Sequence, residues 1–195
     1  GITYPYDISL LGNVFPWEFT LIPTFFLISL WGVGPHRRYA AVKYTLMMLA
    51  GFEPATNGEI YLNGNPINNV PPHKRGIGMV FQNYALFPHM TVAENLSFPL
   101  EVRKMGKSDR EAKVKRALDM VQMGAFGGRR PAQLSGGQQQ RIALARALVF
   151  EPELVLMDEP LGALDKQLRE RMQFEITRLA HELGITTVYV THDQT

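Results

Sequence analysis

The chain has 195 residues, a formal net charge of +2 and no cysteine. This length is enough for one sizeable buried core, so a single domain is the starting expectation. A charge so close to zero gives no reason to expect a nucleic-acid partner. The lack of cysteine excludes disulfide bonds and thiol catalysis, and it agrees with a reducing compartment such as the cytoplasm.

Residues 1–44 differ in composition from the rest of the chain. They hold five of the 38 formally charged side chains but ten of the twenty aromatic ones, including both tryptophans. The uncharged stretch from Phe19 to Pro35 precedes His36-Arg37-Arg38 and suggests a hydrophobic leader. The stretch is marginal as a membrane span, because a span needs about 20 apolar residues and Pro23 interrupts it. It also differs from a signal peptide, because no basic region precedes it.

Apolar runs beyond residue 44 predict short strands over 59–62, 77–81, 154–157 and 185–190. The first of these strands leads into a tight turn at Asn63-Gly64. Thr91 and Glu94 have the spacing of a capping box that opens a short helix.

Two longer helices are predicted from apolar periodicity. The first covers 109–123, is capped by Ser108 with Glu111 and ends at Gly124. Its apolar face consists of Val114, Ala117, Leu118 and Val121. The second ends at Gly184, and its apolar stripe consists of Leu168, Met172, Ile176, Leu179 and Leu183. Strands that alternate with helices predict an α/β fold with a parallel sheet and ligands at the carboxyl ends of its strands.

The segment Leu134-Ser135-Gly136-Gly137-Gln138 is suited to phosphate binding. Ser135 can cap the helix predicted over 139–148, with Gln138 closing a capping box. The two glycines let a phosphate approach backbone N–H groups at the positive end of the helix dipole. Twenty residues later, the apolar strand 154–157 ends in Asp158-Glu159.

These two motifs resemble the signature and Walker B motifs of the ATP-binding cassette (ABC) family. Gln82 matches the Q-loop of that family, Asp165 the end of its D-loop and His192 its H-loop. The resemblance covers residues 45–195 and is closest to the importer subgroup for polyamines, sugars or ferric iron. It implies a P-loop NTPase-like parallel sheet core with an inserted helical subdomain at about 83–133, incomplete at both ends. Residues 1–44 lie outside it. Segment 81–95 looks most like the polyamine importers.

The resemblance also implies roles for individual residues. Glu159, His192 and Gln82 would be catalytic, and Asp158 and Gln82 would bind Mg²⁺. Ser135, Gly136, Gly137, Gln138 and Asp165 would contact ATP. The implied partners are transmembrane permease subunits, a second ATPase subunit in a homodimer and, indirectly, a solute-binding protein. The implied location is the cytoplasmic face of the inner membrane. Segment 84–88 has two open interpretations, core packing or contact with a permease.

The sequence departs from the family at the P-loop, because G-x-x-x-x-G-K-[ST] occurs nowhere in it. Alignment on Thr45–Gly51 puts the family lysine at Val42, and Lys43 is one position too late. Two functions therefore stay open: an ATP hydrolase of an importer, or a non-catalytic cassette that lacks the P-loop.

Translation of the coding DNA for residues 1–50 in all three frames tests whether the reading frame or a sequence join fails before Thr45. The abrupt onset of family resemblance favours such a failure over a genuine leader. A frame that runs G-x-x-x-x-G-K-[ST] into Thr45 would support the hydrolase. If no frame contains it, the chain is a degenerate or truncated cassette, and hydrolysis by it alone is not expected.

Overall fold

The computed structural model of the chain describes residues 37–55, 58–161 and 166–190. The chain divides into two compact units, Gly1–Arg75 and Gly76–Thr195. Among the described residues, no helix is both long enough and apolar enough to cross a membrane.

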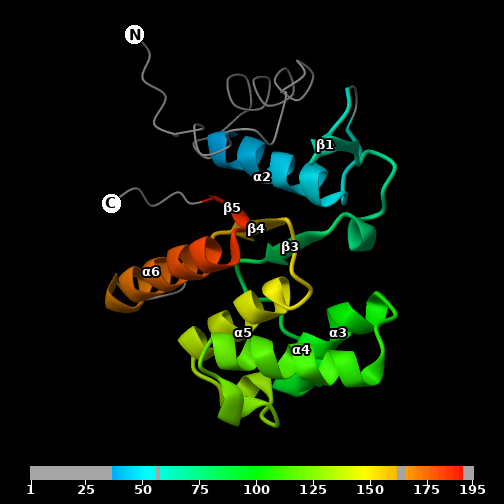
Figure 1. Ribbon diagram of the computed structural model, residues 1–195. Coiled ribbons are helices and arrows are strands. Elements are labelled where there is room, and N and C mark those ends of the chain that lie inside the picture. Colours follow the sequence, from blue (N-terminus) through cyan, green and yellow to red (C-terminus); the bar gives the residue numbers. More distant parts are fainter. Residues whose placement is uncertain (1–36, 56–57, 162–165, 191–195) are drawn as a thin grey trace. The chain divides into compact units, whose positions relative to one another are not determined.

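A parallel sheet of three strands lies at the centre of the second unit (Figure 1). Its order is β3 (Ile77–Val80), β4 (Leu154–Asp158) and β5 (Thr186–Val190). Ile77 pairs with Leu154, which pairs with Thr186, so the strands run side by side from their first residues. The predicted strands and their parallel arrangement are confirmed, with bounds that differ by about one residue.

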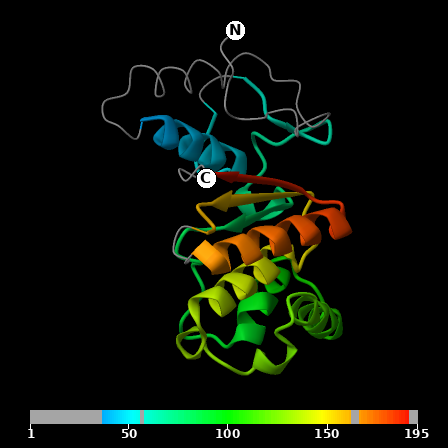
Figure 2. The same cartoon turned by 90° about the vertical axis from the view of Figure 1, so that its left-hand side faces the viewer.

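Four helices connect these strands. Between β3 and β4 the chain forms α3 (Val92–Val102), α4 (Lys107–Met120) and α5 (Gly136–Leu148), together with the short 3₁₀ turns η4 (Gly124–Phe126) and η5 (Pro131–Gln133). Between β4 and β5 it forms α6 (Lys166–Leu183). In both views α5 and α6 lie on the same side of the sheet, and α3 and α4 pack against α5 (Figure 2).

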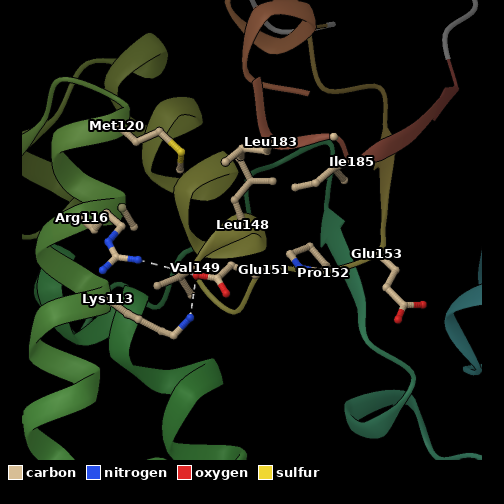
Figure 3. Close-up of a pocket in the computed structure, with 12 residues that line it drawn as sticks. Lys113, Arg116, Met120, Leu148, Val149, Glu151, Pro152, Glu153, Leu183 and Ile185 are labelled. Carbon is tan, nitrogen blue, oxygen red and sulfur yellow. Dashed lines mark ion pairs between the residues drawn. The ribbon is translucent and has the colours of Figure 1, made fainter. Parts of the chain in front are cut away.

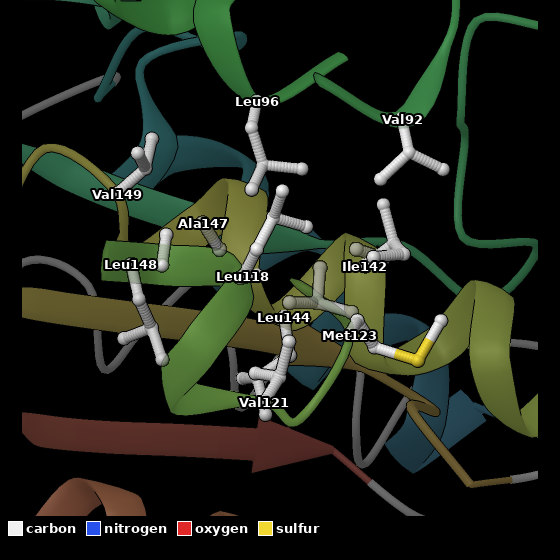
Figure 4. Packing of buried hydrophobic residues seen from close by; sticks show 14 of the residues in the cluster. Val92, Leu96, Leu118, Val121, Met123, Ile142, Leu144, Ala147, Leu148 and Val149 are labelled. Atoms are coloured by element: carbon white, nitrogen blue, oxygen red, sulfur yellow. The ribbon is translucent and has the colours of Figure 1, made fainter. Parts of the chain in front are cut away.

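One apolar cluster joins these helices to the sheet (Figure 4). Leu96 of α3, Ile142 of α5 and Val155 of β4 are completely buried in it. The predicted apolar face of α4 is buried there as well, at Val114, Ala117, Leu118 and Val121. Burial of the apolar side chains of this cluster is the main favourable contribution to the folding free energy of the unit.

Two predicted capping boxes are present. The Thr91 backbone N–H donates to Glu94 at 2.7 Å, and the Glu94 N–H donates to the Thr91 hydroxyl at 3.2 Å. These hydrogen bonds lower the pKa of Glu94. The second box, Ser135 with Gln138, opens α5 in the same way.

The predicted ends of α4 are wrong. The helix begins at Lys107 after an N-cap at Gly106, so Ser108 lies inside the first turn and makes no cap. It ends before Gly124, because Gln122 adopts φ +58° and the Met123 N–H donates to the Leu118 carbonyl at 2.8 Å. This is a Schellman motif with glutamine in place of the usual glycine, which the glycine rule did not anticipate.

The apolar stripe of α6 is only partly buried. Met172 and Leu179 have 0% and 2% of their surface exposed, but Leu183 is 43% exposed. Gly184 ends the helix with φ +63°, as predicted. The last turn of α6 therefore lies outside the core, although the periodicity continues through it.

The first unit contains helix α2 (Arg37–Ala50) and the antiparallel hairpin β1 (Tyr61–Leu62) and β2 (Asn65–Pro66). Asn63 and Gly64 both have positive φ, 48° and 76°, as the predicted tight turn requires.

Arg75 is the central polar group of this unit. Its guanidinium donates to the carbonyls of Met48 and Leu49 at the end of α2, both at 2.9 Å, and to that of Val70 at 2.7 Å. Burial lowers the pKa of Arg75. A cation at this end of a helix satisfies free carbonyls and complements the helix dipole.

We expect Leu96→Ala to lower the free energy of unfolding by about 3 kcal/mol, because it leaves a cavity in the cluster. Urea denaturation followed by circular dichroism measures the change. Val102→Ala on the same helix is the control, since Val102 is 41% exposed and should cost less than about 1 kcal/mol. Equal losses would show that Leu96 does not pack in a tight core.

We expect Arg75→Met to lower the free energy of unfolding by about 2 kcal/mol, because it leaves buried carbonyls without donors. Lys74→Met, one residue away and exposed, is the matched control. Proteolysis within α2, followed by mass spectrometry, measures local opening. Unchanged cleavage in Arg75→Met would contradict this role.

Candidate functional site

Two predicted site residues meet at the carboxyl edge of the sheet. Gln82 follows β3, and Glu159 follows β4 directly. The Gln82 side-chain amide donates to the Glu159 carboxylate, with Nε2 and Oε2 2.6 Å apart. Asp158, the last residue of β4, is adjacent in the chain. The sheet therefore brings together residues separated by 77 positions.

Glu159 is held in an unusual backbone conformation. Its φ is +46°, a region that residues other than glycine rarely adopt. Its backbone N–H donates to the carbonyl of Val190 at the end of β5, at 3.0 Å. Glu159 is only 6% exposed and Asp158 only 5%. Strained residues of this kind persist where the surroundings fix them and often occur at functional sites.

The side chains at this edge of the sheet could bind Mg²⁺ only if water and the phosphate oxygens of a bound ligand completed its coordination. Within the described ranges, no group of three or more His, Cys, Asp or Glu side chains could hold a metal ion. Mg²⁺ in proteins often has one or two carboxylates and completes its coordination with water and phosphate oxygens. The Asp158 carboxylate and the Gln82 amide are compatible with that mode.

The signature residues form a separate group at the start of α5. The Ser135 backbone N–H donates to the Gln138 side chain at 2.9 Å, and the Gln138 N–H reaches the Ser135 hydroxyl at 3.4 Å. Ser135 and Gly136 are exposed, whereas Gly137 is buried. A Cβ added to Gly136 would meet nothing within 4 Å, so its backbone is open to a ligand. His192 and Asp165 lie outside the described residues.

Segment 84–88 is partly buried and partly exposed. Tyr84 is buried in the apolar cluster, and burial raises the pKa of its hydroxyl. Ala85 and Pro88 are exposed. Core packing is therefore correct for Tyr84, and part of the segment presents a free surface.

Two residues of α5 that the sequence motifs do not indicate also contact this region. The Gln140 side chain donates to the carbonyl of Pro160, which follows Glu159, at 2.6 Å. The Arg146 guanidinium donates to the carbonyls of Ala85 and Tyr84 at 2.7 and 3.0 Å. Gln140 has helical spacing with Gly137 and Leu144, and a glutamine on this otherwise apolar face is the sequence signal that could have revealed it.

A pocket of about 310 Å³ lies at the opposite edge of the sheet (Figure 3). It is lined by Pro152 and Glu153 before β4, by Ile185 before β5 and by residues of α4. Glu151 in its wall pairs with Lys113 at 2.7 Å. The pocket is distinct from the edge that carries Gln82 and Glu159, because it lies where the strands begin.

Known proteins resemble most of this chain. "Spermidine/putrescine import ATP-binding protein PotA" of Clostridium novyi (strain NT) is 55% identical over 150 residues, covering 77% of this chain and 43% of the relative. The protein of that name from Pseudomonas aeruginosa (strain UCBPP-PA14) is 56% identical over 153 residues, covering 78% and 42%. The chain thus spans about two fifths of the length of these curated relatives.

Solved structures resemble it in fold. The structure described as "Dimeric structure of a post-hydrolysis state of the ATP-binding cassette MJ0796 bound to ADP and Pi" matches with a TM-score of 0.67 at 33% identity, over 82% of this chain and 72% of the other. The predicted α/β fold of an ABC cassette is thereby confirmed. A family model described as "ABC transporter" matches residues 44–162. The chain belongs to the ABC transporter family.

Proposed function

We propose that the chain is the ATP-binding and ATP-hydrolysing part of an importer for spermidine, putrescine or a related polyamine. The observation that carries this proposal is the hydrogen bond of 2.6 Å between Gln82 and Glu159 at the carboxyl edge of the sheet. It joins two motif positions that act on the same phosphate in this family. The names of the relatives support the class of solute.

In this proposal Glu159 orients or deprotonates the water that attacks the γ-phosphate of ATP. Gln82 holds the Glu159 carboxylate by a hydrogen bond, and its side-chain amide also helps to bind Mg²⁺ and contacts the γ-phosphate. Asp158 binds Mg²⁺ through water, and the ion neutralises phosphate charge. His192 donates a hydrogen bond to the γ-phosphate.

The start of α5 contacts ATP held by a second ATPase subunit. Ser135, Gly136, Gly137 and Gln138 offer backbone N–H groups at a helix N-terminus, where an anion is stabilised. Asp165 of the D-loop contributes to the same interface. The dimeric MJ0796 structure supports an assembly of two cassettes.

Residues of about 83–133, which include α3 and α4, form the helical subdomain of this proposal. Phe87 and Phe98 make an edge-on ring contact at 4.9 Å, and Phe98 is 37% exposed. This partly exposed aromatic pair, in which Phe87 belongs to segment 84–88, suits contact with a transmembrane permease subunit. The chain then works as a peripheral protein on the cytoplasmic face of the inner membrane, and a solute-binding protein acts on the permeases.

A non-catalytic cassette is the second candidate. Alignment on Thr45–Gly51 places the family's phosphate loop and its lysine at 36–43, and residues 37–43 of this stretch lie in α2. This stretch lacks the glycines of a phosphate loop and its lysine at the matching position, so it offers neither the close backbone approach nor the cation that hold the phosphates. Loss of the lysine alone removes a charge-assisted contact worth about 1.5–3 kcal/mol. Such a chain would lend Ser135 to an intact partner.

We expect Glu159→Gln to reduce ATP hydrolysis about 100-fold or more in a complex with permease subunits, because the general base is lost. Spermidine-stimulated phosphate release from proteoliposomes measures it. Glu182→Gln, an exposed change on α6, is the control and should leave the rate unchanged. A Glu159→Gln rate within threefold of wild type would reject the proposed role.

Mixing experiments separate the two candidates. If the chain alone binds no fluorescent ATP analogue but supports hydrolysis by an intact cassette, it is the non-catalytic partner. In that mixture Ser135→Ala should lower the rate. Thr91→Ala removes the equivalent cap of α3 and should not, so it controls for loss of helix stability.

A further inference from the structure

The turn after Gln82 contains two strained residues in a row. Tyr84 has φ +61° and Ala85 has φ +46°. A left-handed conformation is strained for a residue other than glycine. The local hydrogen bonds, from Tyr84 N–H to the Phe81 carbonyl at 2.9 Å and from Ala85 N–H to the Asn83 carbonyl at 2.7 Å, belong to the turn itself. An interaction from outside the turn must therefore help to hold it.

Arg146 of α5 supplies that interaction. One guanidinium nitrogen donates to the Ala85 carbonyl at 2.7 Å and another to the Tyr84 carbonyl at 3.0 Å. The guanidinium carbon also lies 5.7 Å from the ring centre of Phe87, two residues further along. The planar fork of arginine can bond two adjacent carbonyls at once, which a lysine cannot do in the same geometry.

The charge of Arg146 is partly withdrawn from water. Burial lowers the pKa of its guanidinium. A desolvated cation is costly unless hydrogen bonds compensate it, so the two carbonyls and the Phe87 ring are its compensation. The contact is thus specific, in contrast to an exposed surface arginine.

Helix α5 also contacts the segment that carries Glu159, through the side chain of Gln140. Gln140 is 1% exposed and donates to the carbonyl of Pro160, the residue after Glu159. Helix α5 therefore contacts the segment that carries Gln82 through Arg146 and the segment that carries Glu159 through Gln140. Any movement of α5 must act on both segments.

We propose that Arg146 is a positioning residue that holds the strained turn 84–85 and thereby keeps Gln82 in place against Glu159. Through this chain of contacts, helix α5, whose first turn contains the signature residues, is linked to the carboxylate of Glu159, the residue after β4. The catalytic importance of this link rests on the proposed role of Glu159, but the link itself requires no nucleotide.

Hydrogen exchange of the full chain without nucleotide tests the first step. In Arg146→Met we expect amides of residues 84–87 to exchange at least about tenfold faster, which corresponds to loss of one charge-assisted hydrogen bond. Amides of β4 report general destabilisation. Arg141→Met removes another cation of α5, paired with Glu175 at 3.2 Å, and should leave residues 84–87 unchanged.

A conservative variant and a rescue variant keep the test decisive if Arg146→Met is poorly folded. Arg146→Lys retains the charge at the end of α5 but not the fork, so residues 84–87 should still exchange faster. Ala85→Gly removes the strain at φ +46° and should bring Arg146→Lys back to within about threefold of wild type. Full protection in Arg146→Lys would overturn the proposal, because charge alone would then suffice.

The side-chain amide signal of Gln82 in an NMR spectrum tests the second step. We expect this signal to move in Arg146→Met toward its position in Glu159→Ala, where its acceptor is missing, and to stay in place in Arg141→Met. An unmoved signal, with faster exchange at 84–87, would overturn the link to Gln82. Failure of the proposed ATPase would be seen separately, as absent hydrolysis with this signal unaffected.

Discussion

The second unit depends on the burial of β4 between two parallel neighbours. All five of its residues are buried, and it pairs with β3 on one side and with β5 on the other. Because both faces of β4 are buried, its apolar residues form a continuous run, and its pairing with both neighbours sets one register for the sheet. The register in turn brings the ends of the three strands together. Asp158 and Glu159 stay buried at that edge, where carboxylates need polar partners.

Helix α5 provides much of the polar framework around this edge. It packs on the sheet through small and apolar residues, and its Gln140 and Arg146 side chains reach backbone carbonyls outside the helix. Carbonyl acceptors make these contacts independent of the side chains at the acceptor positions. One rigid element thus contacts the segments that follow both β3 and β4. This arrangement suits a protein in which, as we propose, the start of α5 senses a nucleotide.

The first unit follows a different principle. The guanidinium of Arg75 donates hydrogen bonds to carbonyls at the end of α2 and in the loop after the hairpin. Gly51 leaves room for it, since a Cβ there would lie 2.6 Å from the guanidinium carbon. Family resemblance begins at residue 44, inside α2. The sequence before that residue lacks the glycines and the lysine of a phosphate loop at their required spacing, and this lack bears directly on which of the two proposed functions applies.

Local patterns and motifs of fixed spacing were enough to predict the three strands of the parallel sheet, the capping boxes at Thr91 and Ser135, and the family. They misplaced the ends of α4 and the exposure of Leu183, because a Schellman end and the limits of a core depend on contacts between elements. The hydrogen bonds from Gln82 to Glu159 and from Arg146 to the turn at 84–85 could not be read from the sequence. Such contacts join residues about 60 to 80 positions apart, and only sheet register and helix packing bring them within hydrogen-bonding distance.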